Sequence, residues 1–182
     1  MLIRNPIVWL RRFLHRRGYG IHSPYAFGLV TQVVYNPGEY YADRWLARLH
    51  PWYVRLFHLR PLACHRLLFR LANHFQPHLI AAPDGVSTVE WNYLHEGCRQ
   101  AIIDPGMPRG EADMFILKDN HPEALQHITE HSLLVVSDLR HNQPLWQTVK
   151  SDPRTRVTFD LYDLGLVLFN PKLNKQNYIV NW

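Results

Sequence analysis

The stretch HLIAAPDGVSTVEWNYLHEGC, residues 78–98, decides the fold class of this chain. Its apolar run at 79–82 (LIAA) predicts a buried strand, and Pro83-Asp84-Gly85 predicts a tight turn. Ser87 and Glu90 have the spacing of a capping box, so we expect a helix to begin there. A strand, a tight turn and a helix N-terminus form the unit with which open α/β folds bind nucleotides. The turn holds one glycine, so the Gly-rich fingerprint of a strong nucleotide site is missing.

The residues after this stretch alternate between short apolar strands and helices. Strands are expected at 100–104, 113–118 and 132–137, and helices are expected to begin at Pro122 and Pro144. Continuous apolar strands that alternate with helices predict a parallel sheet covered on both faces. The last two expected strands, 157–161 and 166–169, are separated by only four residues. They therefore form an antiparallel hairpin, and the sequence predicts a mostly parallel α/β sheet that ends in one.

The first 75 residues are expected to form a helical region, and residues 76–182 the α/β core. Helices are expected from Pro6, from Pro24, at 40–49 and at 65–75, while the form of 50–63 is left open. A length of 182 residues suits a single domain, 1–182. The Trp and Tyr residues between 40 and 53 have helical spacing, and we interpret them mainly as core. The alternative is that they stack on a substrate.

Composition and charge limit the classes of protein. A hydrophobic content of 47% argues against disorder, and no apolar run reaches the ~20 residues of a transmembrane segment. Arg11 and Arg12 interrupt the apolar run that a signal peptide would need. The two cysteines, Cys64 and Cys98, provide neither a disulfide framework nor a metal site. We therefore expect a cytoplasmic protein with reduced cysteines.

The net charge of +5 is concentrated in the N-terminal part, where arginines crowd the first seventeen residues. A basic front end can contact nucleic acid or an anionic membrane surface. A solvated helix face is the simpler interpretation, and we do not expect nucleic acid as a partner. The sequence leaves the oligomeric state open, with an oligomer among the possibilities.

Three stretches resemble one family. They are GYGIHSPYAF at 18–27, HRLLFRLANHFQPHLI at 65–80 and DLYDLGLVLFNPKLNKQNYIV at 160–180. Residues 18–27 resemble the opening motif of a bacterial subgroup related to small O-methyltransferases. Residues 65–80 resemble the helix that leads into the subgroup's first strand, and residues 160–180 resemble its terminal hairpin. The chain thus resembles the class I methyltransferases that depend on S-adenosylmethionine (SAM), which implies a Rossmann-like sheet and methyl transfer to a small molecule.

The resemblance also implies the position of the cofactor. SAM would lie over Asp84, Gly85 and Ser87, with its ribose at Asp104 and with Asp119 at the edge of the site. Two of these residues have structural alternatives, since Asp84 could cap the turn and Asp104 could be a turn acid that faces solvent.

Other polar residues follow adjacent parallel strands and are expected to line the crevice at the carboxyl ends of the sheet. They are His121, Asp138, Arg140 and His141. The catalytic residues are not identified, but Asp138 and His141 are the candidates that could assist the methyl acceptor. No metal ion is expected, because His127 and His131, at i and i+4 of an expected helix, have no third ligand.

The middle of the chain departs from the pattern of an active family member. Ala81 stands where the family has an acid, and Pro83 stands where it has the first glycine of the turn. Proline fixes φ and removes an N–H donor, so it cannot replace that glycine. Lys118 replaces another strand-ending acid, and the third strand of the family sheet is expected to be missing. The alternative to a SAM enzyme is therefore a non-catalytic binding or scaffold protein, whose crevice would be filled by its own side chains, such as Pro83 or Trp91.

Overall fold

The computed structural model describes residues 12–15, 18–57 and 59–182, which form two compact units. The sheet unit comprises Pro77–Gly85 and Ala101–Val180. The helical unit comprises the described residues up to Gln76, together with Val86–Gln100 and Asn181–Trp182. The expectation of a single domain, 1–182, stays a prediction.

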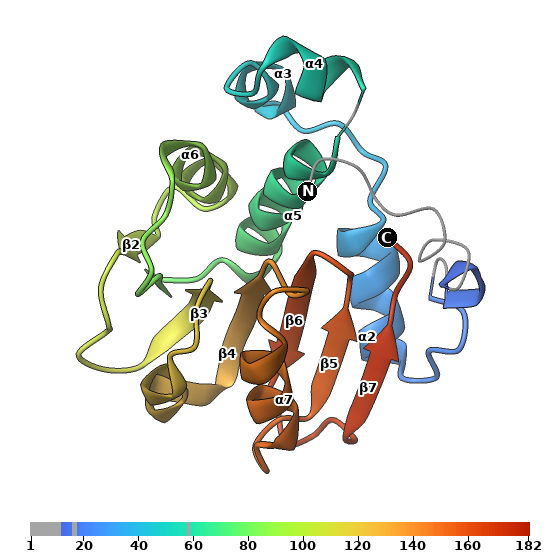
Figure 1. The fold of residues 1–182 in the computed structure, drawn as a ribbon, viewed down its shortest axis with the longest axis vertical. Helices are drawn as coiled ribbons and strands as arrows, with labels where there is room; N and C mark the ends of the chain where they lie inside the picture. Colours follow the sequence, from blue (N-terminus) through green and yellow to red (C-terminus); the bar gives the residue numbers. More distant parts are fainter. Residues whose placement is uncertain (1–11, 16–17, 58) are drawn as a thin grey trace. The chain divides into compact units, whose positions relative to one another are not determined.

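The sheet unit contains a seven-stranded sheet in the order β2-β1-β3-β4-β6-β5-β7 (Figure 1). The strands are β1 (Leu79–Ala81), β2 (Ile102–Asp104), β3 (Ala112–Leu117), β4 (Ile128–Ser137), β5 (Val157–Asp160), β6 (Leu164–Leu168) and β7 (Gln176–Ile179). Strands β2, β1, β3 and β4 are parallel, while β6 is antiparallel to both β4 and β5. The predicted mostly parallel sheet with a C-terminal antiparallel hairpin is confirmed.

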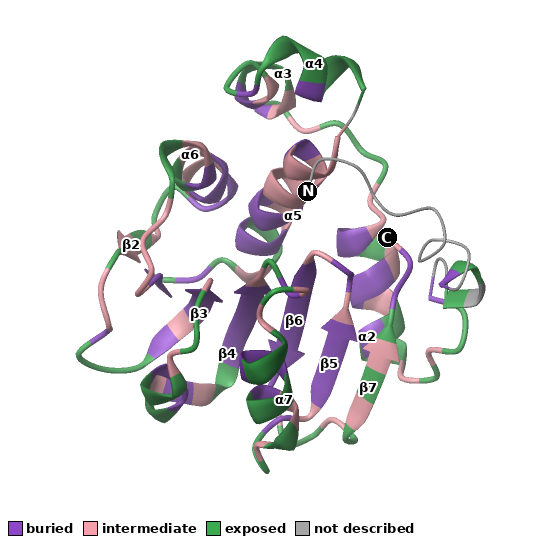
Figure 2. Cartoon of the chain, viewed as in Figure 1, coloured by how far each residue is buried: buried purple, intermediate pink, exposed green. Residues whose placement is uncertain are grey.

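The sheet also bears out the expected loss of a strand. Strand β2 lies at the edge of the sheet, and the chain passes from its end at Asp104 to β3 at Ala112 through a short loop. At the other edge, β7 pairs in parallel with β5. The sequence did not predict β7. Its side chains alternate between half-buried and exposed positions, unlike the fully buried strands at the centre (Figure 2).

Carboxylates hold the short strand β1 against β3. Oδ2 of Asp113 accepts hydrogen bonds from the backbone N–H groups of His78 (2.8 Å) and Leu79 (3.0 Å) at the start of β1. Because β1 is only three residues long, its own ladder provides few hydrogen bonds. The Asp113 side chain therefore supplies a substantial part of the attachment at the amino end.

A buried cluster lies on the face of the sheet that α7 (Gln143–Ser151) covers. Leu145, Trp146 and Val149 of α7 pack there with residues of β3, β4 and β6. Gly165 of β6 allows this packing, since a Cβ at that position would lie 2.6 Å from the Trp146 ring. The indole therefore lies directly against the β6 backbone.

The helical unit has its own core. Its elements are a 3₁₀ turn (Phe13–His15), α2 (Pro24–Leu29), the π-helix η2 (Val30–Val34), α3 (Asp43–Ala47), α4 (Trp52–Leu56), α5 (Arg60–Phe75) and α6 (Thr88–Gly97). Ala42, Leu46, Val54, Leu62, Phe69 and Tyr93 form its buried cluster. Helices α5 and α6 approach closely at Gly97, where a Cβ would lie 2.5 Å from the carbonyl oxygen of Phe69. The last residues of the chain join this unit, because Arg60 Nη1 donates to the carbonyl oxygen of Trp182 (3.0 Å).

Two expectations for the helices are corrected, and a third lies outside the described residues. The segment expected as one helix at 40–49 contains the five-residue α3, and 50–63 contains α4 and the start of α5. The segment from Pro122 is a 3₁₀ helix that ends at His127, and His131 lies in β4, so these two histidines do not share a helix. The helix expected from Pro6 falls largely on residues 1–11, outside the described residues.

The interpretation of the Trp and Tyr residues at 40–53 as core is wrong for most of them. Tyr41, Trp45, Trp52 and Tyr53 are exposed, and only Tyr40 is half-buried, against the ring of Phe69. Helical spacing misled here because α3 and α4 are too short to bury a continuous stripe.

Candidate functional site

The carboxyl ends of the parallel strands β1, β2, β3 and β4 lie on the same side of the sheet, where the strands end. The register places Ala81 beside both Asp104 of β2 and Phe115 of β3, and places Leu117 of β3 beside Val136 of β4. The loops that follow these four strands therefore emerge together. Open α/β sheets bind their ligands at this edge, so it is the candidate site.

The turn after β1 has the predicted position. Gly85 N–H donates to the carbonyl oxygen of Ala82 (2.7 Å), and Gly85 has φ +72°, a conformation that favours glycine. The Ala82 N–H donates to the carbonyl oxygen of Asp104 (2.8 Å) and ties the turn to β2. The turn is thus fixed by backbone hydrogen bonds on both sides.

Asp84 connects this turn to the loop after β3. Its Oδ2 accepts hydrogen bonds from the backbone N–H groups of Lys118 (2.8 Å) and Asp119 (3.1 Å). Its Oδ1 lies 2.5 Å from Nε2 of His121, whose Nδ1 lies 2.9 Å from Oε1 of Glu123. The Asp84 side chain is only 10% exposed. The carboxylate therefore has three partners from its own unit, an arrangement that we call the Asp84 clamp.

The electrostatics of the clamp favour a charged pair. Partial burial opposes ionisation of Asp84, but the N–H groups of Lys118 and Asp119 and the His121 side chain outweigh it and lower the pKa of Asp84. Hydrogen bonds to Glu123 and Asp84 raise the pKa of His121. Both ring nitrogens of His121 face carboxylates, and both can donate only when the ring is protonated. When His121 is protonated, the clamp becomes an imidazolium between two carboxylates.

Ser87 performs the predicted capping role in the helical unit. Its Oγ accepts a hydrogen bond from Glu90 N–H (3.2 Å), and its own N–H donates to Glu90 Oε2 (2.7 Å). This reciprocal pair is the capping box expected from the sequence. The side chain of Ser87 is thus used at the start of α6.

Asp104 and Asp119 differ in their surroundings. Asp104, at the end of β2, is half-buried, and its Oδ1 accepts a hydrogen bond from Gly106 N–H (2.8 Å). This is the geometry of an Asx turn, although the side chain is half-buried and not the solvent-facing turn acid of the alternative. Asp119 is exposed, and its backbone N–H belongs to the clamp. The role of either carboxylate in binding a cofactor stays a prediction.

The two candidate catalytic residues lie together after β4. Nδ1 of His141 is 2.7 Å from Oδ2 of Asp138, and both side chains are exposed. Asp138 has φ +47°, a left-handed conformation that aspartate tolerates better than most residues. Arg140 points elsewhere, since its guanidinium lies over the Tyr162 ring and 3.3 Å from Asp163. The His141–Asp138 pair could act as a base, but it is open to solvent.

Asn142 was not singled out from the sequence, although it joins two strand ends. Its amide donates to the carbonyl oxygens of Lys118 and Ser137, after β3 and at the end of β4. An asparagine just before a Gln-Pro helix start is a common N-cap, and that was the available signal. Its hydrogen bonds instead stabilise the edge of the sheet.

Several side chains expected at the cofactor make hydrogen bonds within the protein. The side chains of Asp84, Ser87 and Asp104 all accept hydrogen bonds from their own units. Trp91, proposed as a filler of the crevice, is 41% exposed and stacks on His95 of α6. Within the described part of the chain, no three His, Cys, Asp or Glu side chains come together as metal ligands. Three of the side chains expected to meet SAM, those of Asp84, Ser87 and Asp104, thus already have partners.

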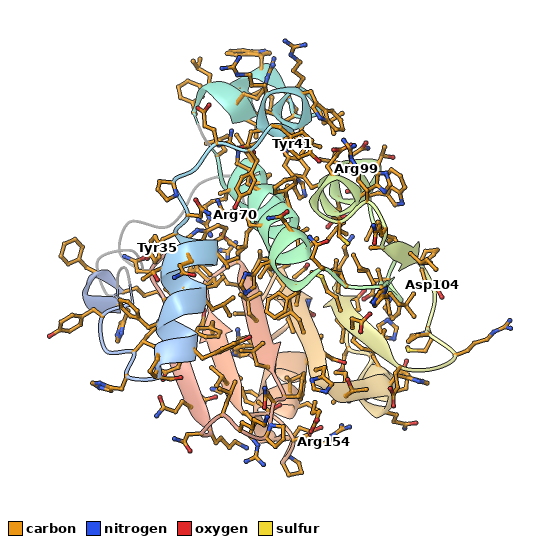
Figure 3. All side chains as sticks on the ribbon, turned by 180° about the vertical axis from the view of Figure 1, so that it is seen from behind. Tyr35, Tyr41, Arg70, Arg99, Asp104 and Arg154 are labelled. Atoms are coloured by element: carbon orange, nitrogen blue, oxygen red, sulfur yellow. The ribbon has the colours of Figure 1, made fainter. Side chains whose placement is uncertain are left out.

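A cavity of the sheet unit, with a volume of about 210 Å³, lies at the end of the strands opposite to the candidate site. Its lining residues come from the amino ends of β4 and β5 and the end of β6: Ile128, Thr129, Glu130, Arg154, Arg156, Phe169 and Pro171. Figure 3 shows Arg154 well away from Asp104. This cavity is separate from the candidate site.

Comparisons with known proteins concern the fold. No protein-family model matches the sequence, and no curated protein sequence matches it. The chain is similar in structure to the SAH-bound methyltransferase PaMTH1 of Podospora anserina, where SAH is S-adenosylhomocysteine. That match has a TM-score of 0.50 and 9% identity over 81% of this chain and 96% of the other.

A methyltransferase from Geobacter sulfurreducens is another structural match. It has a TM-score of 0.49 and 12% identity over 71% of this chain and 90% of the other. The strand order, the antiparallel hairpin and the likeness to PaMTH1 agree with one another. The chain therefore has the Rossmann-like fold of the methyltransferases.

Proposed function

We propose that this chain is a non-catalytic binding or scaffold protein with a methyltransferase fold. The observation that carries the proposal is the Asp84 clamp, in which the carboxylate after β1 is held by Lys118, Asp119 and His121. A carboxylate has about four acceptor positions, so one with three protein partners can offer a ligand little more than one hydrogen bond. Breaking hydrogen bonds of a nearly buried carboxylate is costly, so the clamp favours a structural role for this edge.

The sequence departures support the same proposal. Ala81 ends β1 without the acid of the family pattern, and Pro83 provides no N–H in the turn. Asp104 ends the edge strand β2, and in the part of the chain that the structure describes no further strand extends the site beyond it. The changes at Ala81 and Pro83 each remove a polar group from the region that would hold SAM. The position of β2 leaves that region without a neighbouring strand.

The test is the binding of SAH, the product that SAM leaves after methyl transfer. A protein without a cofactor site should not bind it. The purified chain is titrated with SAH and with SAM by calorimetry, and its melting temperature is measured with millimolar concentrations of each, high enough to detect even weak sites. We expect neither heat nor a shift of the melting temperature. A dissociation constant in the micromolar range would overturn the proposal.

A second candidate function is SAM-dependent methyl transfer to an oxygen or nitrogen of a small molecule. It is favoured by Asp104, which ends β2 beside Ala81 where the family resemblance implies a ribose ligand, and by the exposed His141–Asp138 pair. If SAH binds, Asp104→Ala should weaken binding at least about 10-fold, since a charged hydrogen bond contributes ~1.5–3 kcal/mol. Glu130→Ala, near the amino end of β4 and away from the candidate site, is the matched control.

A further inference from the structure

The outward side of α3 and α4 carries an unusual concentration of large apolar side chains. Trp52 and Phe57 are each 65% exposed, and Leu56 is 63% exposed. The aromatic–arginine patch comprises Trp45, Leu49, Trp52, Tyr53, Leu56 and Phe57 together with Arg44, Arg48 and Arg55, all of them exposed. Figure 2 shows the outer side of these two helices as exposed. Scattered single apolar residues are normal on protein surfaces, but a group of this size marks an interaction site.

The core of the helical unit does not need these side chains. Each short helix already contributes one fully buried residue, Leu46 from α3 and Val54 from α4. These two pack with Leu62, Phe69 and Tyr93. The patch is therefore an additional apolar surface and not a poorly buried part of the core.

The segment that carries the patch contains charges of one sign in the sequence. Residues 44–83 contain no Asp or Glu, and their arginines are Arg44, Arg48, Arg55, Arg60, Arg66 and Arg70. Residues 1–83 contain eleven arginines and two acids, a net charge of +9, whereas residues 84–182 carry −4. The acid nearest to the patch in sequence, Asp43, is 3.8 Å from Nε of Arg66. The patch thus combines apolar side chains with arginines whose own segment, 44–57, contains no acid.

We propose that the aromatic–arginine patch docks the protein on an anionic lipid bilayer. Trp and Tyr side chains prefer the depth of the lipid headgroups, and Leu and Phe enter the acyl boundary. The long aliphatic stems of Arg48 and Arg55 allow their guanidinium groups to remain at the phosphates. Pro51 separates two five-residue helices, so the segment suits binding in the plane of the interface. None of the helices in the described ranges is long and apolar enough to cross a membrane.

A second copy of the chain fits this surface less well. Most homodimers are two-fold symmetric, so the same patch would face itself across the interface. Arg44, Arg48 and Arg55 of both copies would then meet with no acid in the patch to pair with them. Like charges brought together in this way oppose association.

Nucleic acid also fits less well. Single-stranded nucleic acids bind aromatic and basic surfaces, but the apolar half of this patch includes the aliphatic residues Leu49 and Leu56, which do not stack on bases. The segment 44–57 contains no Ser, Thr, Asn or Gln that could hydrogen-bond to base edges. An anionic bilayer uses both the aliphatic and the charged parts of the patch.

The experiment is sedimentation of the full chain with large vesicles at about 0.1 M NaCl, where the Debye length is still ~10 Å. Vesicles of equal parts phosphatidylglycerol and phosphatidylcholine are compared with vesicles of phosphatidylcholine alone. We expect binding to the anionic vesicles that is at least about 10-fold stronger than to the neutral ones, because each arginine near an anionic surface contributes about a five-fold gain in partitioning.

Two double variants separate the apolar from the charged contribution. Leu56→Ser with Phe57→Ser should weaken binding to the anionic vesicles at least about 10-fold, because apolar area no longer enters the bilayer. Arg48→Gln with Arg55→Gln should weaken the same binding about 25-fold and leave binding to neutral vesicles unchanged.

Controls come from exposed residues of the sheet unit, Ile102→Ser and Arg109→Gln. Circular dichroism and melting temperature check that each variant folds. Fluorescence quenching by lipids brominated in the acyl chain gives an independent readout, and the quenched fraction should fall in Trp52→Phe.

Three results would overturn the proposal. The first is absence of binding to the anionic vesicles. The second is binding that the controls weaken as much as the patch variants do. The third is a dimer, or a complex with single-stranded RNA, that the patch variants abolish while vesicle binding is unchanged.

Discussion

Oδ1 of Asp84 lies 2.5 Å from Nε2 of His121, so the turn after β1 is joined to the loop after β3 by a hydrogen bond that becomes an ion pair when His121 is protonated. Asp113 likewise attaches the amino end of β1 to β3, because its carboxylate accepts hydrogen bonds from two backbone N–H groups there. A three-residue strand is thus attached to its neighbour by a carboxylate at each end. This symmetry is the physical basis for assigning Asp84 to structure.

Replacing Asp84 should lower stability. Asp84→Ala leaves the N–H groups of Lys118 and Asp119 without their acceptor, which should lower the free energy of unfolding by about 2 kcal/mol. Asp84→Asn retains one oxygen that can accept both bonds and should cost less. Urea denaturation of the two variants measures the difference, with Asp113→Ala as the structural control. Equal stability of wild type and Asp84→Ala would contradict the clamp.

The clamp should also give stability a specific pH dependence. Because the pKa of His121 is raised on folding, its contribution is fully present below about pH 6.5 and is lost as the pH rises through the raised value. Because the pKa of Asp84 is lowered, its contribution is present above about pH 4 and is lost as the pH falls through the lowered value. The pair therefore contributes most between about pH 4 and 6.5.

Comparison with His121→Gln isolates this contribution from that of other histidines. Between about pH 6 and 9 the wild type should lose on the order of 0.5 kcal/mol more stability than the variant, since the ring of His121 is partly exposed and its ion pairs are screened by solvent. Unfolding curves over this pH range measure the difference. A larger loss in the variant would have the wrong sign.

Gly97 should be irreplaceable at the contact between α5 and α6. In Gly97→Ala the new Cβ would lie 2.5 Å from the carbonyl oxygen of Phe69, a backbone atom that cannot move aside alone. Overpacking of this kind costs about 1–3 kcal/mol. Gly28→Ala in α2 is the control, because no atom lies within 4 Å of its Cβ position. That change should raise stability by about 0.5–1 kcal/mol. A Gly97→Ala variant as stable as wild type would refute the close approach.

The sequence predicted those features of the fold that depend on local signals. The capping box of Ser87 and Glu90, the turn at Gly85 and the hairpin of β5 and β6 depend on nearby residues, and all three are present. Strand β7 was missed because the edge sequence QNYI is half polar and lacks the apolar run of a buried strand.

The candidate site was predictable only in outline. The sequence showed which residues follow the strands, but not that Asp84 accepts from the backbone at Lys118, which depends on the register of β1 against β3. The exposure of Trp45 and Trp52 was likewise unpredictable, because it depends on where two short helices end. Pairings between distant segments are set by the fold and not by spacing.

Calorimetric titration of the full chain with SAH tests the central claim most directly. The Asp84 clamp and the internal hydrogen bonds of the Ser87 and Asp104 side chains predict no detectable heat up to millimolar SAH. A saturable heat with a micromolar dissociation constant, reduced in Asp104→Ala and unchanged in Glu130→Ala, would contradict the account and identify the chain as an SAH-binding protein.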